Sequence, residues 1–245
     1  MLLSDPGKTP YDLCFDIFGF PVRIHPFFWI IGLLLGGNGG LDSALVWIAV
    51  LFISILVHEL GHAFMIRRFG SSCRISLYGM GGLAMPGRGR PCTDREQIII
   101  ALAGPFAGFA LAAAIVLLCT LMGMEVDSTK LFKVIPFWEI FPNNDSVVLT
   151  NFIKGMLRIN IFWGLVNLLP VLPLDGGRVS YVLFRQRDRL YGEKKALKLS
   201  MVVAIGVVLL GISKQEIFIA ILFGYLAYEN YVQLNPQAGG GRSFR

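Results

Sequence analysis

Residues 43–66 read SALVWIAVLFISILVHELGHAFMI, and this apolar stretch decides the fold of the chain. A helix needs about 20 mostly apolar residues to cross the hydrocarbon core of a bilayer, and this stretch is long enough. Its only acid is Glu59, and its only other ionisable residues are His58 and His62. The stretch therefore predicts a transmembrane helix that carries three ionisable side chains within the apolar layer.

The composition of the whole chain agrees with a membrane protein. Of its 245 residues, 55% are hydrophobic and 16% are charged, against roughly 45–50% and about 25% in soluble domains. An intrinsically disordered chain is excluded, because disorder requires low hydrophobicity and high charge. A single soluble domain would have too few polar side chains to cover its surface. We therefore expect an all-α polytopic membrane protein.

Five more apolar runs lie on either side of residues 43–66. They are residues 24–37, 98–122, 157–174, 199–212 and 217–232. Together these six runs predict about six transmembrane helices.

The connections between these runs differ in charge. Residues 67–97 hold six arginines and two acids, and residues 178–198 hold seven Lys or Arg residues and two acids. Residues 123–150 hold two lysines and four acids. Because loops rich in Lys and Arg stay in the cytoplasm, both termini are expected there. These loops also account for the net charge of +6, so we expect no nucleic-acid partner.

The expected domain organisation follows from the six runs and their orientation. Residues 1–23 form a cytoplasmic N-terminal segment, residues 24–232 form the membrane domain, and residues 233–245 form a cytoplasmic tail. A multi-pass protein with this orientation fits a bacterial inner membrane.

The five residues from His58 to His62 form an H-E-x-x-H motif inside the expected helix. A spacing of four places both imidazoles on one face, about 5–6 Å apart at Cβ, which suits two ligands of one metal ion. Glu59 can then take a proton from a metal-bound water without being a ligand. There are two alternatives. The three side chains could have a structural role, with their hydrogen bonds made to neighbouring hydroxyl groups, or they could line a path for protons. Because ionisable groups in an apolar helix are costly unless paired or metallated, we favour a metal site.

Asp175 is the strongest candidate for a third ligand, since a catalytic zinc usually has three protein ligands. It follows the fourth apolar run, which ends at the same membrane leaflet as residues 43–66. Two prolines end that helix early, and we expect the glycine pair after Asp175 to permit a turn that aims its carboxylate at the imidazoles. The alternative is that Asp175 caps a short helix around residues 178–185.

Together these residues resemble the site-2 protease family of intramembrane zinc metalloproteases. The resemblance rests on HELGH in one apolar run and NLLPVLPLDGG, residues 167–177, in a later one. Ala103-Gly104-Pro105 and residues 79–84 add to it. It implies a three-helix catalytic core within about residues 43–185.

The resemblance also implies roles for individual residues. His58, His62 and Asp175 would bind one zinc ion per chain, Glu59 would be the general base, and Asn167 would help to hold the substrate backbone. Residues 74–84 would form a short β-hairpin after the metal helix, whose edge could bind an extended substrate as an added strand. The alternative for these residues is an ordinary cytoplasmic loop. His25 either lines the catalytic cavity or lies at the membrane interface, which we favour.

The function implied is hydrolysis of peptide bonds in or near transmembrane segments, known as regulated intramembrane proteolysis. The expected form is compact, without PDZ or nucleotide-binding modules, and the expected partners are a transmembrane protein or membrane-peptide substrate and the lipid bilayer. Three alternatives remain open. They are a catalytically silent membrane scaffold, a metal-binding or transport protein, and a protease of small membrane peptides.

Overall fold

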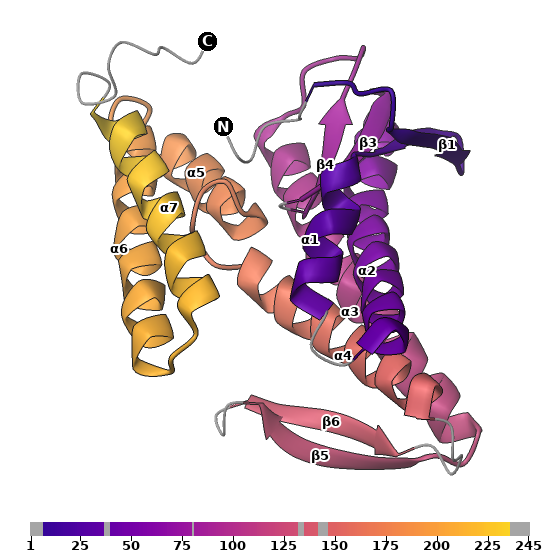
Figure 1. Cartoon of the computed structure of the whole chain (residues 1–245). Helices are drawn as coiled ribbons and strands as arrows, with labels where there is room; N and C mark the ends of the chain where they lie inside the picture. Colours follow the sequence, from indigo (N-terminus) through magenta and orange to yellow (C-terminus); the bar gives the residue numbers. More distant parts are fainter. Residues whose placement is uncertain (1–6, 37–39, 80, 132–134, 142–146, 236–245) are drawn as a thin grey trace. The chain divides into compact units, whose positions relative to one another are not determined.

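The structure is a computed structural model that describes residues 7–36, 40–79, 81–131, 135–141 and 147–235 (Figure 1). The chain divides into two compact units, each of which is described by itself. The first unit comprises residues 1–91 and 103–164, and the second comprises residues 92–102 and 165–245.

Four helices are long and apolar enough to cross a membrane. They are α2 (Gly40–Arg68), α3 (Asp94–Leu121), α6 (Gly192–Ser213) and α7 (Ile217–Leu234). Each coincides with one of the predicted apolar runs to within one residue or contains it, so four of the six expected helices are confirmed. The chain is a membrane protein.

The other two predicted spans differ from the helices observed. α1 (Pro26–Gly36) has 11 residues and is about 16 Å long, roughly half of a hydrocarbon core. α4 (Val147–Asn167) has 21 residues, but it begins and ends earlier than the predicted span of residues 157–174. Lys154 and Arg158 interrupt the apolar pattern at its start, and Pro170 prevents its continuation. The total of six spans therefore stays a prediction.

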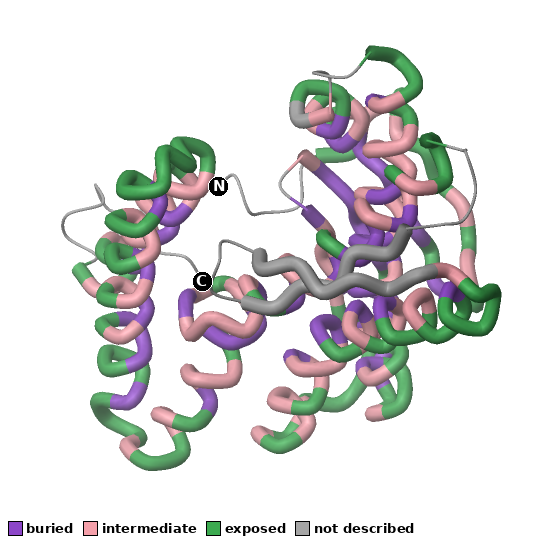
Figure 2. The backbone as a smooth tube through the Cα atoms, turned by 90° about the horizontal axis from the view of Figure 1, so that it is seen from below, coloured by how far each residue is buried: buried purple, intermediate pink, exposed green. Residues whose placement is uncertain are grey.

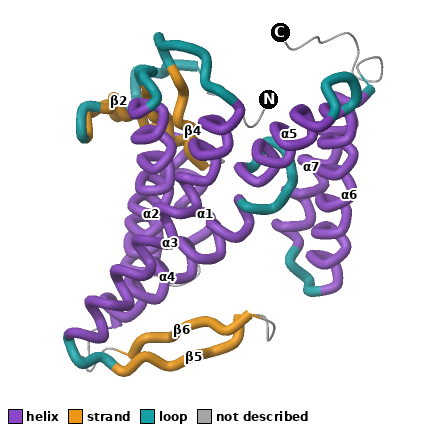
Figure 3. The backbone as a smooth tube through the Cα atoms, turned by 180° about the vertical axis from the view of Figure 1, so that it is seen from behind, coloured by secondary structure: helices purple, strands orange, loops and turns teal. Residues whose placement is uncertain are grey.

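A four-stranded sheet in the order β1-β2-β3-β4 belongs to the first unit (Figure 3). β3 (Cys73–Tyr78) and β4 (Gly81–Pro86) pair as an antiparallel hairpin, which confirms the hairpin predicted after the metal helix. β1 (Leu13–Ile17) and β2 (Phe20–Ile24) form a second hairpin, and β2 pairs with β3 in parallel. No strand was expected in this N-terminal segment.

The two central strands of the sheet are largely buried. In β2, the residues Phe20, Val22 and Ile24 are buried while Pro21 is exposed, which is the period-two pattern of a strand whose one face packs against the protein. In β3, the four consecutive residues 75–78 are all buried, so both faces of this strand are covered there. The sheet is therefore part of the core of the first unit.

The end of α2 is tied to this sheet through Arg67. Its Nη1 donates a hydrogen bond to the Phe18 carbonyl oxygen at 2.7 Å, and its guanidinium lies 4.1 Å from the centre of the Phe20 ring. One side chain thus joins the helix that carries the H-E-x-x-H motif to the β1–β2 hairpin.

The acidic connection contains a second, separate hairpin. β5 (Glu125–Leu131) and β6 (Ile135–Phe141) pair antiparallel. The sequence analysis treated residues 123–150 only as a charged loop, so these strands were missed. Of the predicted C-terminal tail, residues 236–245 lie outside the described part of the chain.

The second unit contains α5 (Asp175–Arg187), α6 and α7. α6 buries Ala196, Ser200 and Ala204, which recur at every fourth position on one face (Figure 2). Large apolar residues such as Val202 and Leu209 are exposed on other faces, as expected for a helix surrounded by lipid.

Candidate metal centre

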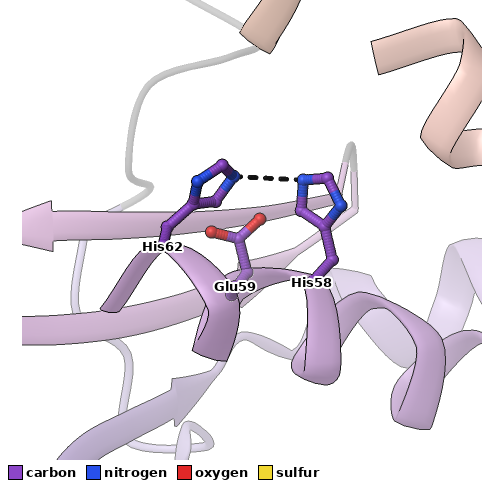
Figure 4. A group of neighbouring side chains, drawn as sticks. All are labelled: His58, Glu59 and His62. Carbon is purple, nitrogen blue, oxygen red and sulfur yellow. Dashed lines mark hydrogen bonds between the residues drawn. The ribbon is translucent and has the colours of Figure 1, made fainter. Parts of the chain in front are cut away.

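Three side chains of α2 form the candidate metal centre. His58, Glu59 and His62 are each 5% exposed, although all three can carry charge. Figure 4 shows the two imidazole rings facing each other, with the Glu59 carboxylate between them. Their potential ligand atoms lie within 4.8 Å of one another, and the described residues contain no other group of three His, Cys, Asp or Glu side chains so arranged.

The spacing of the two imidazoles fits a shared zinc ion. The Nε2 atoms of His58 and His62 are 3.2 Å apart. Two nitrogens bound at about 2.0–2.1 Å to a tetrahedral zinc would be separated by about 3.3 Å. The same spacing also allows one protonated Nε2 to donate a hydrogen bond to the other when no metal is bound.

Gly104 of α3 keeps the space in front of these nitrogens open. A Cβ atom at this position would lie 2.2 Å from His62 Nε2 and 2.7 Å from His58 Nε2. Any side chain there would fill the space that a shared metal ion requires. At Gly61, a Cβ atom would lie 2.4 Å from the Ala103 carbonyl oxygen, so the glycine inside HELGH lets α3 approach α2 this closely.

Gly82 of β4 packs directly against Glu59. A Cβ atom at this position would lie 2.4 Å from Glu59 Cγ and 2.7 Å from its Oε1. Because β4 is at one end of the strand order, the carboxylate lies beneath an edge strand of the sheet. The predicted hairpin therefore reaches the predicted general base.

Cys73, at the start of β3, is also close enough to interact with Glu59. Burial and, to a smaller extent, the negative charge of Glu59 raise the pKa of the Cys73 thiol to about 12. The thiol therefore stays protonated at neutral pH.

A buried polar contact ties α2 to α4 one turn before His58. Asn160 Nδ2 donates hydrogen bonds to Ser54 Oγ at 2.9 Å and to the Met156 carbonyl oxygen at 2.8 Å. Ser54 and Asn160 are each 3% exposed. This pair was not predicted. The signal that could have indicated it is a serine in an apolar helix, four residues before a predicted metal ligand.

Asn167 and Asp175 are both buried and both belong to the second unit. Asn167 is the last residue of α4, and Asp175 is the first residue of α5. The structure brings His58, Glu59 and His62 together, whereas the roles of Asn167 and Asp175 at the metal centre stay predictions. Leu174 occupies the cap position of α5, and Asp175 lies in the first turn of that helix.

The turn expected at Gly176 and Gly177 is wrong. Both glycines lie in the first turn of α5, and neither has a positive φ. A Cβ atom at Gly176 would lie 2.1 Å from the Leu168 carbonyl oxygen, and one at Gly177 would lie 2.4 Å from the Val171 carbonyl carbon. The glycines are needed because the preceding backbone packs directly against them.

His25 has a local structural role. Its Nδ1 accepts a hydrogen bond from the Phe27 backbone N–H at 3.2 Å, next to the first residue of α1. Its own backbone N–H donates to the Leu77 carbonyl oxygen at 2.8 Å. The side chain is 6% exposed, so His25 caps α1 at its junction with the sheet. The cavity role and the interface role of His25 both stay predictions.

Comparisons with known proteins identify relatives of this chain. The sequence model described as Peptidase family M50 matches residues 46–211. A zinc metalloprotease of Methanocaldococcus jannaschii is 25% identical over 217 residues, covering 87% of this chain and 53% of that protein. The Mycobacterium tuberculosis protein Rip3 is 30% identical over 217 residues, covering 81% of this chain and 50% of that protein. The chain thus spans about half the length of these curated relatives.

A solved structure has the same fold. It is a site-2 protease from Methanocaldococcus jannaschii, which matches with a TM-score of 0.58 at 21% sequence identity. The match covers 96% of this chain and 97% of that one.

Proposed function

The chain belongs to peptidase family M50, and from this membership we propose that it is an intramembrane zinc metalloprotease. It would hydrolyse peptide bonds in or near the transmembrane segments of other membrane proteins. The observation that carries this proposal is the pair of buried imidazoles 3.2 Å apart at Nε2, with the buried Glu59 carboxylate beside them. A metal ion at this point would account for three ionisable groups inside an apolar helix.

We propose that His58, His62 and Asp175 hold the zinc ion. Asp175 is supported by its burial at 5% exposure. Zinc, when bound, supplies a Lewis acid and a water whose pKa is lowered to about 7. Glu59 would accept a proton from the attacking water and return it to the leaving amine.

The substrate would bind as an extended strand. A helix hides its carbonyl groups in i to i−4 hydrogen bonds, so a transmembrane substrate must unwind before it is cut. β4 is an edge strand with Gly82 against Glu59, which favours the strand-addition role of the hairpin over an ordinary loop. Main-chain hydrogen bonds to β4 would hold the substrate beside the base, and the Asn167 amide would bind its backbone.

The charge pattern supports a site that opens to the cytoplasm. α2 ends at Arg67 and Arg68, so it would run inward with both termini of the chain in the cytoplasm. His62 and His58 would then lie roughly 8–14 Å below the cytoplasmic surface at 1.5 Å rise per residue. Water needed for hydrolysis would enter from that side, and a bacterial inner membrane fits this arrangement.

The experiment that tests this function compares the purified chain with its Glu59→Gln variant and with Glu96→Gln as a matched control. Glu96 lies in the first turn of α3 and bonds the Thr93 backbone N–H. We expect about one zinc per chain in all three proteins. Fragments cut within transmembrane segments should appear with the wild type and with Glu96→Gln only.

Two other outcomes would contradict the proposal. Bound zinc without any fragment that depends on Glu59 would indicate a catalytically silent scaffold. Absence of zinc, with a His58→Ala variant that keeps full activity, would exclude the whole scheme.

A further inference from the structure

The link between α4 and α5, residues 168–174, has an irregular backbone in an apolar part of the chain. Such backbone is tolerated in a membrane only where its polar groups find partners. Two residues of the link, Pro170 and Pro173, have no N–H group. The backbone N–H groups of four others donate to carbonyl oxygens within the link or at the end of α4. These hydrogen bonds run from Leu168 to Leu165, from Leu169 to Val166, from Val171 to Leu169 and from Leu174 to Val171. Leu172 remains, and it has no local partner of this kind.

Leu172 is held from both sides by two later helices. Its backbone N–H donates to Ser200 Oγ of α6 at 2.6 Å, and its carbonyl oxygen accepts from Asn230 Nδ2 of α7 at 2.8 Å. Ser200 is 0% exposed and Asn230 is 1% exposed. We call these two side chains, with the backbone they hold, the Leu172 clamp.

Asn230 has little freedom to turn away from this contact. The second hydrogen of its Nδ2 group is donated to the Leu226 carbonyl oxygen at 2.7 Å, one turn earlier on α7. Both donors of the amide are therefore in use. A serine and an asparagine inside apolar helices are costly without such partners, and here each makes one hydrogen bond to the backbone of Leu172.

The backbone transmits this constraint to Asp175 over three residues. Pro173 has a fixed φ, and the Leu174 N–H is bonded to the Val171 carbonyl oxygen at 2.8 Å. Beyond Asp175, Gly176 and Gly177 pack against the backbone of Leu168 and Val171. The Asp175 backbone is therefore fixed by contacts on both sides.

We propose that Ser200 and Asn230 are positioning residues of the metal centre. By holding Leu172, they set the place from which the Asp175 carboxylate reaches zinc. This inference rests on the proposed function, in which Asp175 is the third ligand. It gives α6 and α7, which lie outside the expected three-helix core, an indirect part in metal binding, through Leu172 and Asp175.

The test measures zinc affinity of the full-length chain by competition with a chelator. Ser200→Ala removes one oxygen atom, and Asn230→Leu replaces the amide by an apolar group of similar size. The matched controls are Ser213→Ala at the end of α6 and Asn235→Leu at the residue that follows α7. Their side chains donate hydrogen bonds to the nearby carbonyl oxygens of Leu210 and Tyr231. We expect the clamp variants to bind zinc about 10–100-fold more weakly, the range typical of residues behind the ligands, and the controls to change less than about twofold.

A double-mutant cycle with Asp175→Ala separates positioning from general stability. If the clamp acts through Asp175, Ser200→Ala weakens zinc binding in the wild type but causes no further loss in the Asp175→Ala background. The rise in melting temperature produced by saturating zinc should also shrink in Ser200→Ala, measured against its own metal-free form. A purely structural role would lower both melting temperatures together and leave this rise unchanged, which would overturn the inference.

The same measurements distinguish this inference from the proposed function. If Asp175→Ala weakens zinc binding but neither clamp variant does, the clamp is overturned and Asp175 remains a ligand. If Asp175→Ala leaves zinc affinity unchanged, the ligand assignment fails and the clamp inference fails with it.

Discussion

At the scale of single residues, metal binding and the general base can be tested separately, because a different glycine contacts each. Gly104 faces both imidazoles, and Gly82 faces the Glu59 carboxylate, each at a distance that no side chain could occupy. A methyl group at Gly104 would therefore disturb mainly zinc binding, and a methyl group at Gly82 would disturb mainly the position of Glu59. These are residues at which a conservative substitution has a sharply local effect.

Gly104→Ala should strongly weaken zinc binding. Its Cβ atom would lie 2.2 Å from His62 Nε2, so we expect zinc affinity to fall by roughly two orders of magnitude or more. Gly206→Ala on α6 is the control, because a Cβ atom there meets nothing within 4 Å. The control should stabilise the protein by up to about 1 kcal/mol. Wild-type zinc affinity in Gly104→Ala would contradict the location of the metal.

Gly82→Ala should keep zinc binding and lose peptide hydrolysis. Its Cβ atom would displace the Glu59 side chain, which is not proposed as a ligand. We expect the variant to keep about one zinc per chain and to lose at least about 100-fold in the rate of peptide hydrolysis. Hydrolysis at the wild-type rate would show that β4 does not constrain the base.

The cysteines provide a further test at this scale. Because burial and the charge of Glu59 raise the pKa of the Cys73 thiol to about 12, the reactive thiolate appears only in strongly alkaline solution. At pH 8 an alkylating reagent should modify the exposed Cys14 and leave Cys73 unmodified. Mass spectrometry of the labelled protein measures both sites, and equal modification would contradict the buried position of Cys73.

At the scale of helices and strands, elements with a strong periodic signal were predictable and the others were not. The spans around α2, α3, α6 and α7 were recognised because each is a long apolar run. The β1–β2 hairpin was missed because only three alternating residues mark β2 and Pro21 lies among them. The start of α4 was missed because Lys154 breaks the apolar pattern before residue 157.

The contact of Arg67 with the missed hairpin can be tested directly. Arg67→Ala removes the hydrogen bond to Phe18 and the stacking on Phe20, together worth about 1 kcal/mol at an exposed site. Amide hydrogen exchange in residues 13–24 should become about fivefold faster. Arg68→Ala, at the exposed neighbouring position, should leave these rates unchanged, and an equal effect of both substitutions would contradict the contact.

At the scale of the whole molecule, the H-E-x-x-H site was predictable because ionisable residues in an apolar run are costly unless they are paired or bind a metal. The Leu172 clamp was not predictable, because Ser200 and Asn230 are single polar residues whose partner is 28 and 58 positions away. Pattern reasoning detects residues that are close in sequence, whereas such contacts depend on the packing of distant helices. The Gly82–Glu59 contact was missed for the same reason.

The expected topology is tested with single cysteines in a variant without its four native cysteines. With both termini in the cytoplasm, Arg88→Cys would be cytoplasmic, and Gln215→Cys, between α6 and α7, would face the opposite side. A membrane-impermeant maleimide added to intact cells should label Gln215→Cys only. Labelling of Arg88→Cys alone would reverse the orientation.

The central claim is that two imidazoles of α2 and the carboxylate of Asp175 hold one zinc ion. X-ray absorption at the zinc edge of the purified chain tests it most directly. The spectrum should show four nitrogen or oxygen ligands at about 2.0–2.1 Å, including two imidazoles, and Asp175→Ala should remove one oxygen ligand of protein origin. Sulfur ligands at about 2.3 Å, or a spectrum unchanged by His58→Ala, would contradict the claim.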